Sequence, residues 1–161
     1  MYKTILIAII LTSILSCQKD SADEKMVNAL FEKIQANWTI TSFKMEGPDS
    51  DSLDFIFNSG SLKWNTCKFT DEGKGSELCA GGFSLNNVNG SLSYLYDLEK
   101  KTYRLTLGVG SDLVWSEQLE AYSKIMGGEW TLEVAGDNIL IATQLQNTGS
   151  PDLKVSFMAK K

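Results

Sequence analysis

Hydrophobic and polar positions along this chain follow two different periods in different segments. In residues 22–35 the apolar positions recur at helical spacing, just after a Ser21 and Glu24 pair that is typical of a capping box. This pattern predicts an amphipathic helix over residues 22–35 that docks its apolar stripe on the rest of the protein. A helix lying on a membrane surface is the alternative, although its polar face is mixed in charge rather than basic.

From Asn37 onward the period changes to two, which is typical of strands with one buried face. Turn-forming residues separate about nine strand-like runs. The runs cover approximately residues 37–46, 53–57, 62–69, 78–85, 91–96, 103–107, 130–134, 139–145 and 155–159. A stretch with one apolar helical face, ended by Gly127-Gly128, predicts a short helix near 116–126. Many short strands joined by turns predict an antiparallel barrel, with a β-sandwich as the alternative.

Two stretches share a local pattern in which a helix end leads into a tryptophan, a threonine and an aliphatic residue. One runs from Ile34 to Trp38 and the other from Ile125 to Trp130. The two spacings differ by one residue, so we interpret them as similar local patterns and not as a repeat.

Residues 1–16 combine a positive residue, Lys3, with a short apolar run, as secretory signals do. The run is too short for a membrane-spanning helix, which needs about 20 apolar residues. It ends in Ile14-Leu15-Ser16-Cys17, which resembles the lipobox of bacterial lipoproteins. The resemblance implies lipidation of Cys17 and attachment to a membrane through this lipid. An ordinary signal peptide with a chance cysteine is the alternative.

The residues after Cys17 carry a second resemblance. Gln18-Lys19-Asp20, followed by Asp23 and Glu24, is similar to the export signal that follows the lipidated cysteine in Bacteroidetes lipoproteins. It implies a cell-envelope protein on the outer face of the outer membrane, with a periplasm-facing location as the alternative. The expected organisation is a signal peptide at 1–16, a tether and helix at 17–36, and a barrel domain at 37–161.

Composition excludes several functions. The chain has a formal charge of −5, a single arginine and no histidine. An acidic, arginine-poor protein lacks the basic surface of a nucleic-acid-binding protein, so we expect no nucleic-acid partner. Without histidine the usual general base and the commonest metal ligand are missing, so we expect no catalytic residues, no metal and no cofactor. A carboxylate-based hydrolase is the remaining enzymatic alternative, but Asp54 and Glu133 alternate with apolar residues and should point outward.

Cys67 and Cys79 remain after Cys17 is assigned to lipid, and an even pair suits an oxidising compartment. Gly73 lies midway between them in a turn-like stretch, so an antiparallel hairpin folded there would place them opposite each other. We predict a Cys67–Cys79 disulfide, with buried free thiols as the alternative.

The stretch Ala36-Asn37-Trp38-Thr39-Ile40, after a short helix, resembles the first strand of the lipocalin-like domains of Bacteroidetes lipoproteins. The runs at 130–134 and 139–141, joined by a Gly-Asp-Asn turn, are also similar. The resemblance implies an up-and-down barrel of eight or nine strands with an apolar interior open at one end. A barrel of about eight strands either fills itself with side chains or holds one small ligand.

The same resemblance implies non-enzymatic binding of a small apolar or glycan ligand. Aromatic residues on the presumed inner faces are the candidate pocket, and a plain core is the alternative. The candidate contacts are Trp38, Phe55, Phe57, Trp64, Tyr94, Tyr103, Arg104 and Trp130. Arg104 would hold a ligand carboxylate, as an interior arginine does in small lipid-binding barrels, yet its alternation with Tyr103 and Leu105 predicts that it faces outward. The other functional hypothesis is an interaction or adhesion module with a filled barrel, whose partner is an envelope or host protein.

Two tripeptides resemble the Bacteroidetes O-glycosylation pattern of Asp, then Ser or Thr, then an apolar residue. They make Ser21 and Ser52 candidate glycosylation sites. Glycosylation of Ser21 would compete with its role as a helix cap.

Overall fold

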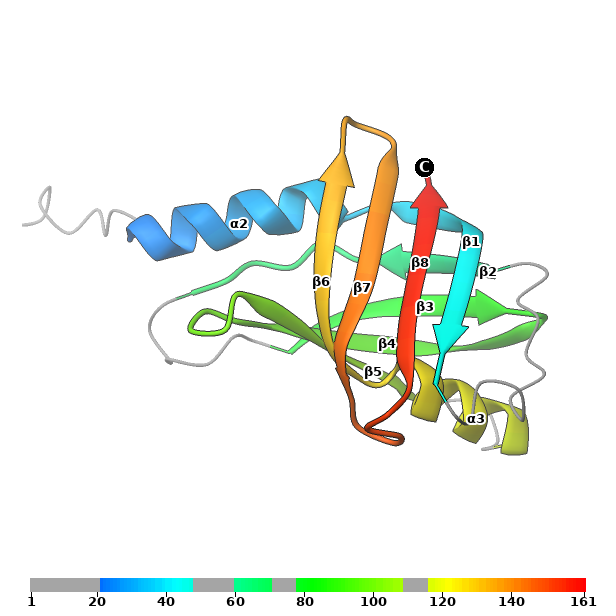
Figure 1. Ribbon diagram of the computed structural model, residues 1–161. Helices are drawn as coiled ribbons and strands as arrows, with labels where there is room; N and C mark the ends of the chain where they lie inside the picture. The colour runs from blue at the N-terminus through cyan, green and yellow to red at the C-terminus, as the bar shows by residue number, and fades with distance from the viewer. Residues whose placement is uncertain (1–20, 48–59, 71–77, 109–115) are drawn as a thin grey trace, which may run out of the picture.

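The computed structural model describes residues 21–47, 60–70, 78–108 and 116–161 (Figure 1). Within them, eight antiparallel strands form one closed barrel in sequence order, and β8 closes on β1. The strands are β1 (Asn37–Glu46), β2 (Gly60–Trp64), β3 (Cys79–Leu85), β4 (Val88–Asp97), β5 (Thr102–Gly108), β6 (Gly128–Ala135), β7 (Ile139–Asn147) and β8 (Lys154–Lys160). Two helices, α2 (Ala22–Ile34) and α3 (Glu117–Met126), accompany the barrel. The predicted up-and-down barrel is confirmed, and the sandwich alternative is wrong.

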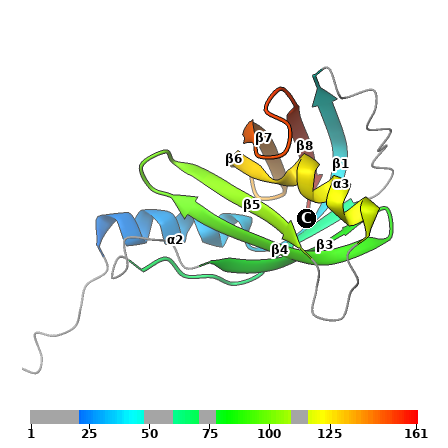
Figure 2. The ribbon, with the colours of Figure 1, turned by 90° about the horizontal axis from the view of Figure 1, so that it is seen from below.

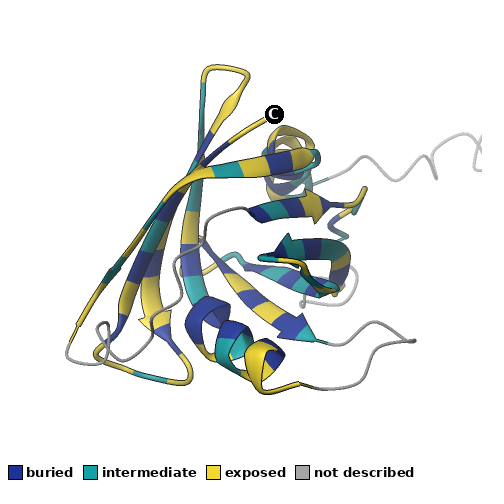
Figure 3. Cartoon of the chain, turned by 90° about the vertical axis from the view of Figure 1, so that its right-hand side faces the viewer, coloured by how far each residue is buried: buried dark blue, intermediate teal, exposed yellow. Residues whose placement is uncertain are grey.

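Most strand predictions agree with the structure to within a few residues. β1 has the predicted bounds, whereas β2 ends at Trp64 instead of continuing to about Phe69. The predicted run that contains Phe55 and Phe57 lies outside the described residues. Buried and exposed positions alternate along the strands (Figure 3), because successive side chains point to opposite faces of a sheet. Every second side chain along a strand therefore points into the barrel.

Helix α2 has the predicted capping box. The Ser21 hydroxyl accepts from the Glu24 backbone N–H at 3.1 Å, and the Ser21 N–H donates to the Glu24 carboxylate at 2.9 Å. The helix buries Val27, Phe31 and Ile34, so its apolar stripe docks on the barrel as predicted. Figure 2 shows α2 beside β4 and β5, at the end where the turn between these two strands projects. No helix in the described part of the chain is long and apolar enough to cross a membrane.

Asn65, just after β2, still donates its N–H to the Ala80 carbonyl of β3 at 3.2 Å, but beyond it the chain lies along α2 instead of extending the sheet. The Asn28 side chain donates to the Phe69 carbonyl at 3.1 Å and accepts from the Phe69 N–H at 2.7 Å. The Gln35 side chain donates to the Cys67 carbonyl at 2.9 Å. These bonds satisfy backbone groups that a longer β2 would have paired with β3, which explains why the strand ends early.

Cys67 and Cys79 form the predicted disulfide, with their Cα atoms 5.6 Å apart. The two strands pair antiparallel as predicted, but the prediction that the cysteines lie directly opposite each other in the ladder is wrong. The β2–β3 ladder ends at the pair Trp64 and Gly81, so Cys67 lies beyond it in the segment held by α2. The disulfide therefore ties this segment to the first residue of β3.

Helix α3 ends where the glycine pair predicts. Gly128 has φ +138°, and a Cβ there would lie 2.0 Å from the Gln146 carbonyl oxygen, so only glycine fits this step into β6. The buried Gln144 side chain donates to the Ile125 and Gly127 carbonyls, each at 3.0 Å, and the Asn147 side chain donates to the Ile125 carbonyl at 2.9 Å. Side chains from β7 thus satisfy carbonyls that the end of a helix leaves unpaired.

Candidate functional site

Five predicted pocket residues lie inside the barrel. All five are buried, and they come from five different strands: Trp38, Trp64, Tyr94, Tyr103 and Trp130. The other two predicted aromatic contacts, Phe55 and Phe57, lie outside the described residues.

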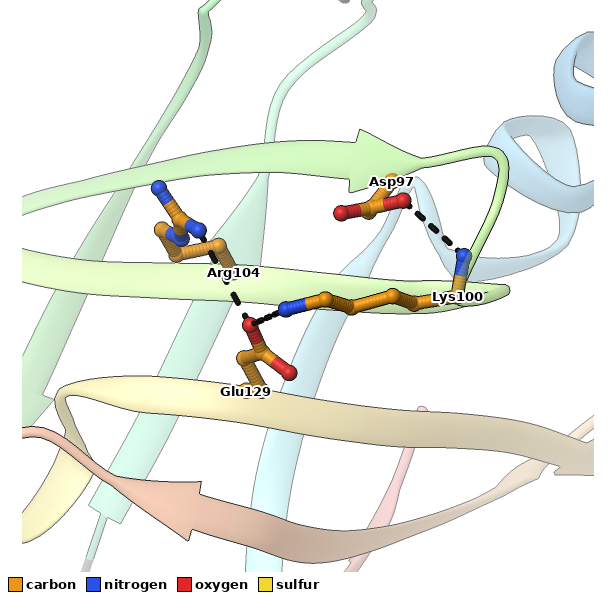
Figure 4. Close-up of polar contacts among 4 residues, drawn as sticks. All are labelled: Asp97, Lys100, Arg104 and Glu129. Carbon is orange, nitrogen blue, oxygen red and sulfur yellow. Dashed lines mark hydrogen bonds and ion pairs between the residues drawn. The ribbon is translucent and has the colours of Figure 1, made fainter.

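Arg104 lies on the outer surface, so its predicted place among the pocket contacts is wrong. Its neighbours Tyr103 and Leu105 are buried in the barrel, and the alternation of the strand turns Arg104 the other way. Figure 4 shows its guanidinium with Glu129, 3.8 Å from the carboxylate, while the Lys100 ammonium is 2.5 Å from the same oxygen. The arginine belongs to an exterior ion-pair group and does not face a ligand inside the barrel.

Five aromatic side chains gather at the end of the barrel where α2 packs. We call them the aromatic cluster; its members come from α2, β2, β4 and β5 and are Phe31, Trp64, Tyr94, Tyr96 and Tyr103. Phe31 lies between two tyrosines, with ring centroids 5.7 Å from Tyr94 and 6.3 Å from Tyr103. Trp64 packs edge-on against Tyr94 at 4.8 Å, and Tyr96 against Tyr103 at 5.0 Å. Edge-to-face contacts of this kind are favourable for aromatic rings.

The predicted pocket residues therefore do not form a single group. Trp64, Tyr94 and Tyr103 belong to the aromatic cluster, whereas Trp130 packs against Phe157 with ring centroids 5.5 Å apart. The Trp38 indole N–H donates to the Ile34 carbonyl at the end of α2, and the Lys161 ammonium is 5.0 Å from the centre of the Trp38 ring. The aromatic cluster therefore brings together three of the predicted pocket residues.

Only some of the polar groups in the aromatic cluster have a hydrogen-bond partner. The Tyr94 hydroxyl donates to the Asn65 carbonyl at 2.9 Å. The Trp64 indole Nε1 and the Tyr103 hydroxyl are buried and have no hydrogen-bond partner in the described structure. A buried polar group left unpaired costs about 1–3 kcal/mol, and most such groups in proteins have a partner. Two hydrogen-bond donors of the cluster therefore lack an acceptor.

The interior around these tyrosines disfavours negative charge. Burial raises the pKa of the Tyr94 hydroxyl to about 12, and a hydrogen bond with Gln35 opposes this only in part. Burial, together with the neighbouring hydroxyls of Tyr96 and Tyr94, raises the pKa of Tyr103 well above its ordinary value. No cation contributes to either shift. The site therefore suits uncharged polar groups.

A second feature, which the sequence did not predict, is a shallow groove of about 460 Å³ open to solvent on the outer wall of β2 and β3. It is lined by Asn37, Ser61, Lys63, Gly82, Phe83, Ser84 and Gly90. Lys63 brings a positive charge to this groove, which the aromatic cluster lacks.

Phe31 is the site residue that sequence analysis missed. Its place in the apolar stripe predicted docking but not an insertion between two barrel tyrosines. The sequence offered one indication of where the helix docks. The link from Ile34 to Trp38 is short, so the end of the helix must stay near the start of β1. Which rings it meets there depends on how the strands are arranged in the barrel.

The predicted modification sites have different outcomes. The Ser21 hydroxyl caps α2 by accepting from the Glu24 N–H. Glycosylation of this hydroxyl would compete with the cap, as the sequence analysis predicted. Cys17 and Ser52 lie outside the described residues. Comparison of the chain with protein-family models, curated proteins and solved structures finds no match.

Proposed function

We propose that this protein binds a small apolar ligand at the aromatic cluster, without catalysing a reaction, while a lipid on Cys17 holds it at the cell envelope. The observation that carries the binding proposal is the pair of buried, unpartnered donors, Trp64 Nε1 and the Tyr103 hydroxyl. An acceptor on a bound ligand would satisfy them and recover the free energy that their burial costs. Aromatic walls with a few polar groups are typical of small-molecule sites.

Helix α2 is the element that would move to admit a ligand. Its Phe31 ring occupies the centre of the cluster, between Tyr94 and Tyr103. The helix packs on the barrel through its buried apolar side chains and is held to residues 67–69 by side-chain hydrogen bonds, while the strands are held by continuous backbone ladders. Local opening of α2 therefore costs less free energy than opening the barrel wall.

The anchor is proposed on the sequence of residues 1–20. The lipobox-like Ile14–Cys17 and the export-like Gln18–Asp20 favour an outer-membrane lipoprotein that faces the outside of the cell. Several acyl chains hold a protein to a bilayer far more durably than one, since each buried methylene contributes about 0.8 kcal/mol. The capped start of α2 at Ser21 leaves a short tether after Cys17, so the barrel would lie close to its membrane.

Native mass spectrometry tests the binding proposal. The processed protein is extracted from its own cell envelope in a mild detergent, and the mass of any retained small molecule is recorded. We expect a defined extra mass that is retained by the wild type and reduced when Phe31→Trp crowds the cluster. Lys63→Gln, in the outer groove, is the matched control and should retain the mass. A protein that carries only its anchor, and whose tryptophan fluorescence does not respond to added apolar molecules, would refute the proposal.

The anchor has its own test. Metabolic labelling with palmitate should mark the wild type and not Cys17→Ala. Equal labelling of the two would refute lipidation at Cys17, and it would leave the binding proposal unaffected.

A second candidate function is contact with another envelope protein or a host protein through the outer wall. It is favoured by exposed apolar side chains on neighbouring strands: Ile139 of β7 is 37% exposed and Met158 of β8 is 44% exposed. Ile141 lies directly opposite Met158 in the ladder and extends this face. Photo-crosslinking in intact cells from a probe placed at Met158, with Thr106 on the outer face of β5 as the control position, tests it. A specific adduct from position 158 alone would support the contact, and identical patterns from both positions would contradict it.

A further inference from the structure

We propose that the ligand of the aromatic cluster carries an uncharged hydrogen-bond acceptor, such as an ester, a ketone or an alcohol oxygen, and that the cluster rejects a carboxylate. This inference rests on the proposed function and adds the chemical class of the ligand. It follows from the donors present in the cluster, the charges absent from it and the position of the only arginine.

The donors determine which kind of group is recognised. The indole N–H of Trp64 can only donate, and the Tyr103 hydroxyl has an unused O–H. Gln35 is the amide side chain beside the cluster, and it is already engaged, because it donates to the Cys67 carbonyl and is hydrogen-bonded with Tyr94. Because Tyr94 already donates to the Asn65 carbonyl, the free capacity belongs to Trp64 and Tyr103. The complementary ligand group is therefore an acceptor.

The charges determine that this acceptor is neutral. All five members of the aromatic cluster are uncharged at neutral pH, and burial raises the pKa of Tyr94 and Tyr103 because the site disfavours an anion. Arg104 is on the outer surface with Glu129, where it cannot neutralise a buried carboxylate. Taking an ion out of water into such a site without a counter-charge is strongly unfavourable, and two neutral donors do not offset this loss of hydration.

The rings determine that the rest of the ligand is apolar. Phe31 contributes a ring tilted against Tyr103, Tyr96 contributes a ring edge-on to Tyr103, and Trp64 contributes an indole against Tyr94. A ligand that replaces the Phe31 ring would contact the faces and edges of these groups. Aliphatic or aromatic chains suit this surface, because burying apolar area on rings is favourable and requires no further hydrogen bonds.

Four probes that share a ten-carbon chain separate the contributions of the apolar chain, the neutral acceptor and the charge: decane, decan-1-ol, methyl decanoate and decanoic acid. The full-length protein is held in lipid nanodiscs, and empty nanodiscs give the amount of each probe taken up by lipid alone. Binding is measured as the rise in melting temperature with probe concentration at about pH 8, where the acid is ionised. We expect the ester and the alcohol to bind about threefold to tenfold more tightly than decane, as one or two net hydrogen bonds allow, and decanoate to bind most weakly.

Three variants locate the effect. Tyr103→Phe removes one hydroxyl and keeps the ring, and Trp64→Phe removes the indole N–H; each should reduce the preference for ester over decane. Lys63→Gln changes the outer groove and should leave that preference unchanged. Any decanoate binding that disappears in Lys63→Gln occurs in the outer groove and is consistent with rejection by the interior.

The outcomes distinguish the two proposals. If none of the four probes binds, the proposed function is overturned and the inference with it. If decane binds as tightly as the ester, or if decanoate binds as tightly as the ester in Lys63→Gln too, the barrel binds a ligand but the neutral-acceptor inference is overturned. A preference for the ester that is unchanged in both Tyr103→Phe and Trp64→Phe would also overturn it.

Discussion

Trp38 and Trp130 make the same hydrogen bond at the beginning of two different strands. Each indole Nε1–H donates to the carbonyl oxygen of the last residue of the preceding helix, Ile34 at 2.7 Å and Met126 at 2.9 Å. The end of a helix leaves carbonyls without partners, and a tryptophan four residues later satisfies one while its ring enters the core. Counted from the last helical residue, the two spacings are equal, which the sequence comparison of Ile34 with Ile125 did not show.

The hydrogen bond that Trp38 and Trp130 share gives the first prediction. Trp38→Phe and Trp130→Phe should each destabilise the protein through lost ring volume and through a carbonyl left without its donor. Trp64→Phe is the matched control, because it loses the same volume but its Nε1 has no partner in the described structure. In urea unfolding, we expect the first two variants to lose about 1–3 kcal/mol more stability than Trp64→Phe. Equal losses in all three would mean that the two hydrogen bonds contribute nothing.

Two tyrosines of the aromatic cluster give the second prediction. Tyr94→Phe removes a hydroxyl that donates to the Asn65 carbonyl, so we expect a loss of about 1 kcal/mol. Tyr103→Phe removes a buried hydroxyl that has no partner among the described residues, so the ligand-free protein should be as stable as the wild type or more stable. Thermal unfolding of both variants checks this difference. Destabilisation of Tyr103→Phe to the same extent as Tyr94→Phe would show that the Tyr103 hydroxyl has a partner in solution.

The disulfide gives the third prediction. Replacing both cysteines, Cys67→Ser with Cys79→Ser, should cost about 3 kcal/mol, because the unfolded chain is no longer constrained by this loop. Cys67 lies in the segment that α2 holds through Asn28 and Gln35, so the loss should be uneven along the chain. Hydrogen exchange should rise in α2 and in residues 65–70 more than in β6 and β7. A uniform rise in all strands would contradict the placement of the disulfide between this segment and β3.

Alkaline pH gives the fourth prediction. Tyr94 and Tyr103 bind their protons more tightly in the folded protein than in the unfolded chain, where a tyrosine has a pKa of about 10. Their contribution to stability is complete below that pH and is lost as the pH rises toward the folded value, about 12 for Tyr94. Melting temperature should therefore fall above about pH 10, and less steeply in Tyr103→Phe. Identical slopes for this variant and the wild type would show that Tyr103 does not titrate differently on folding.

Sequence patterns were sufficient to predict the helices and strands of this fold, because residues within each element determine where it begins, where it ends and which side chains it buries. The capping box of Ser21 and Glu24 starts α2, the glycine pair after Met126 ends α3, and the two-residue alternation of β1 sets its bounds. The alternation of β5 also placed Arg104 outside and Tyr103 inside, because a strand has only two faces. The residue types within each stretch carry this information without reference to the rest of the chain.

Pairings between distant segments could not be predicted in the same way. A hairpin centred on Gly73 placed the two cysteines opposite each other, but beyond Asn65 the chain leaves the sheet, and residues 67–69 bind Asn28 and Gln35 of α2. These contacts join residues about thirty to forty positions apart, and they compete with a strand pairing that local propensity favours equally well. Only the packed protein determines which pairing satisfies more backbone groups.

The sequence by itself determined the antiparallel β class, the two helices and the inward direction of the candidate aromatic residues on the described strands, because each depends on neighbouring positions. It also paired Cys67 with Cys79, because only these two cysteines remain once Cys17 is assigned to lipid. The tertiary structure decided that the barrel closes, that α2 inserts Phe31 between Tyr94 and Tyr103, and that Trp64 and Tyr103 keep unpaired donors beside it. Whether a buried donor finds an acceptor depends on every element packed around it, and no single stretch of sequence contains that information.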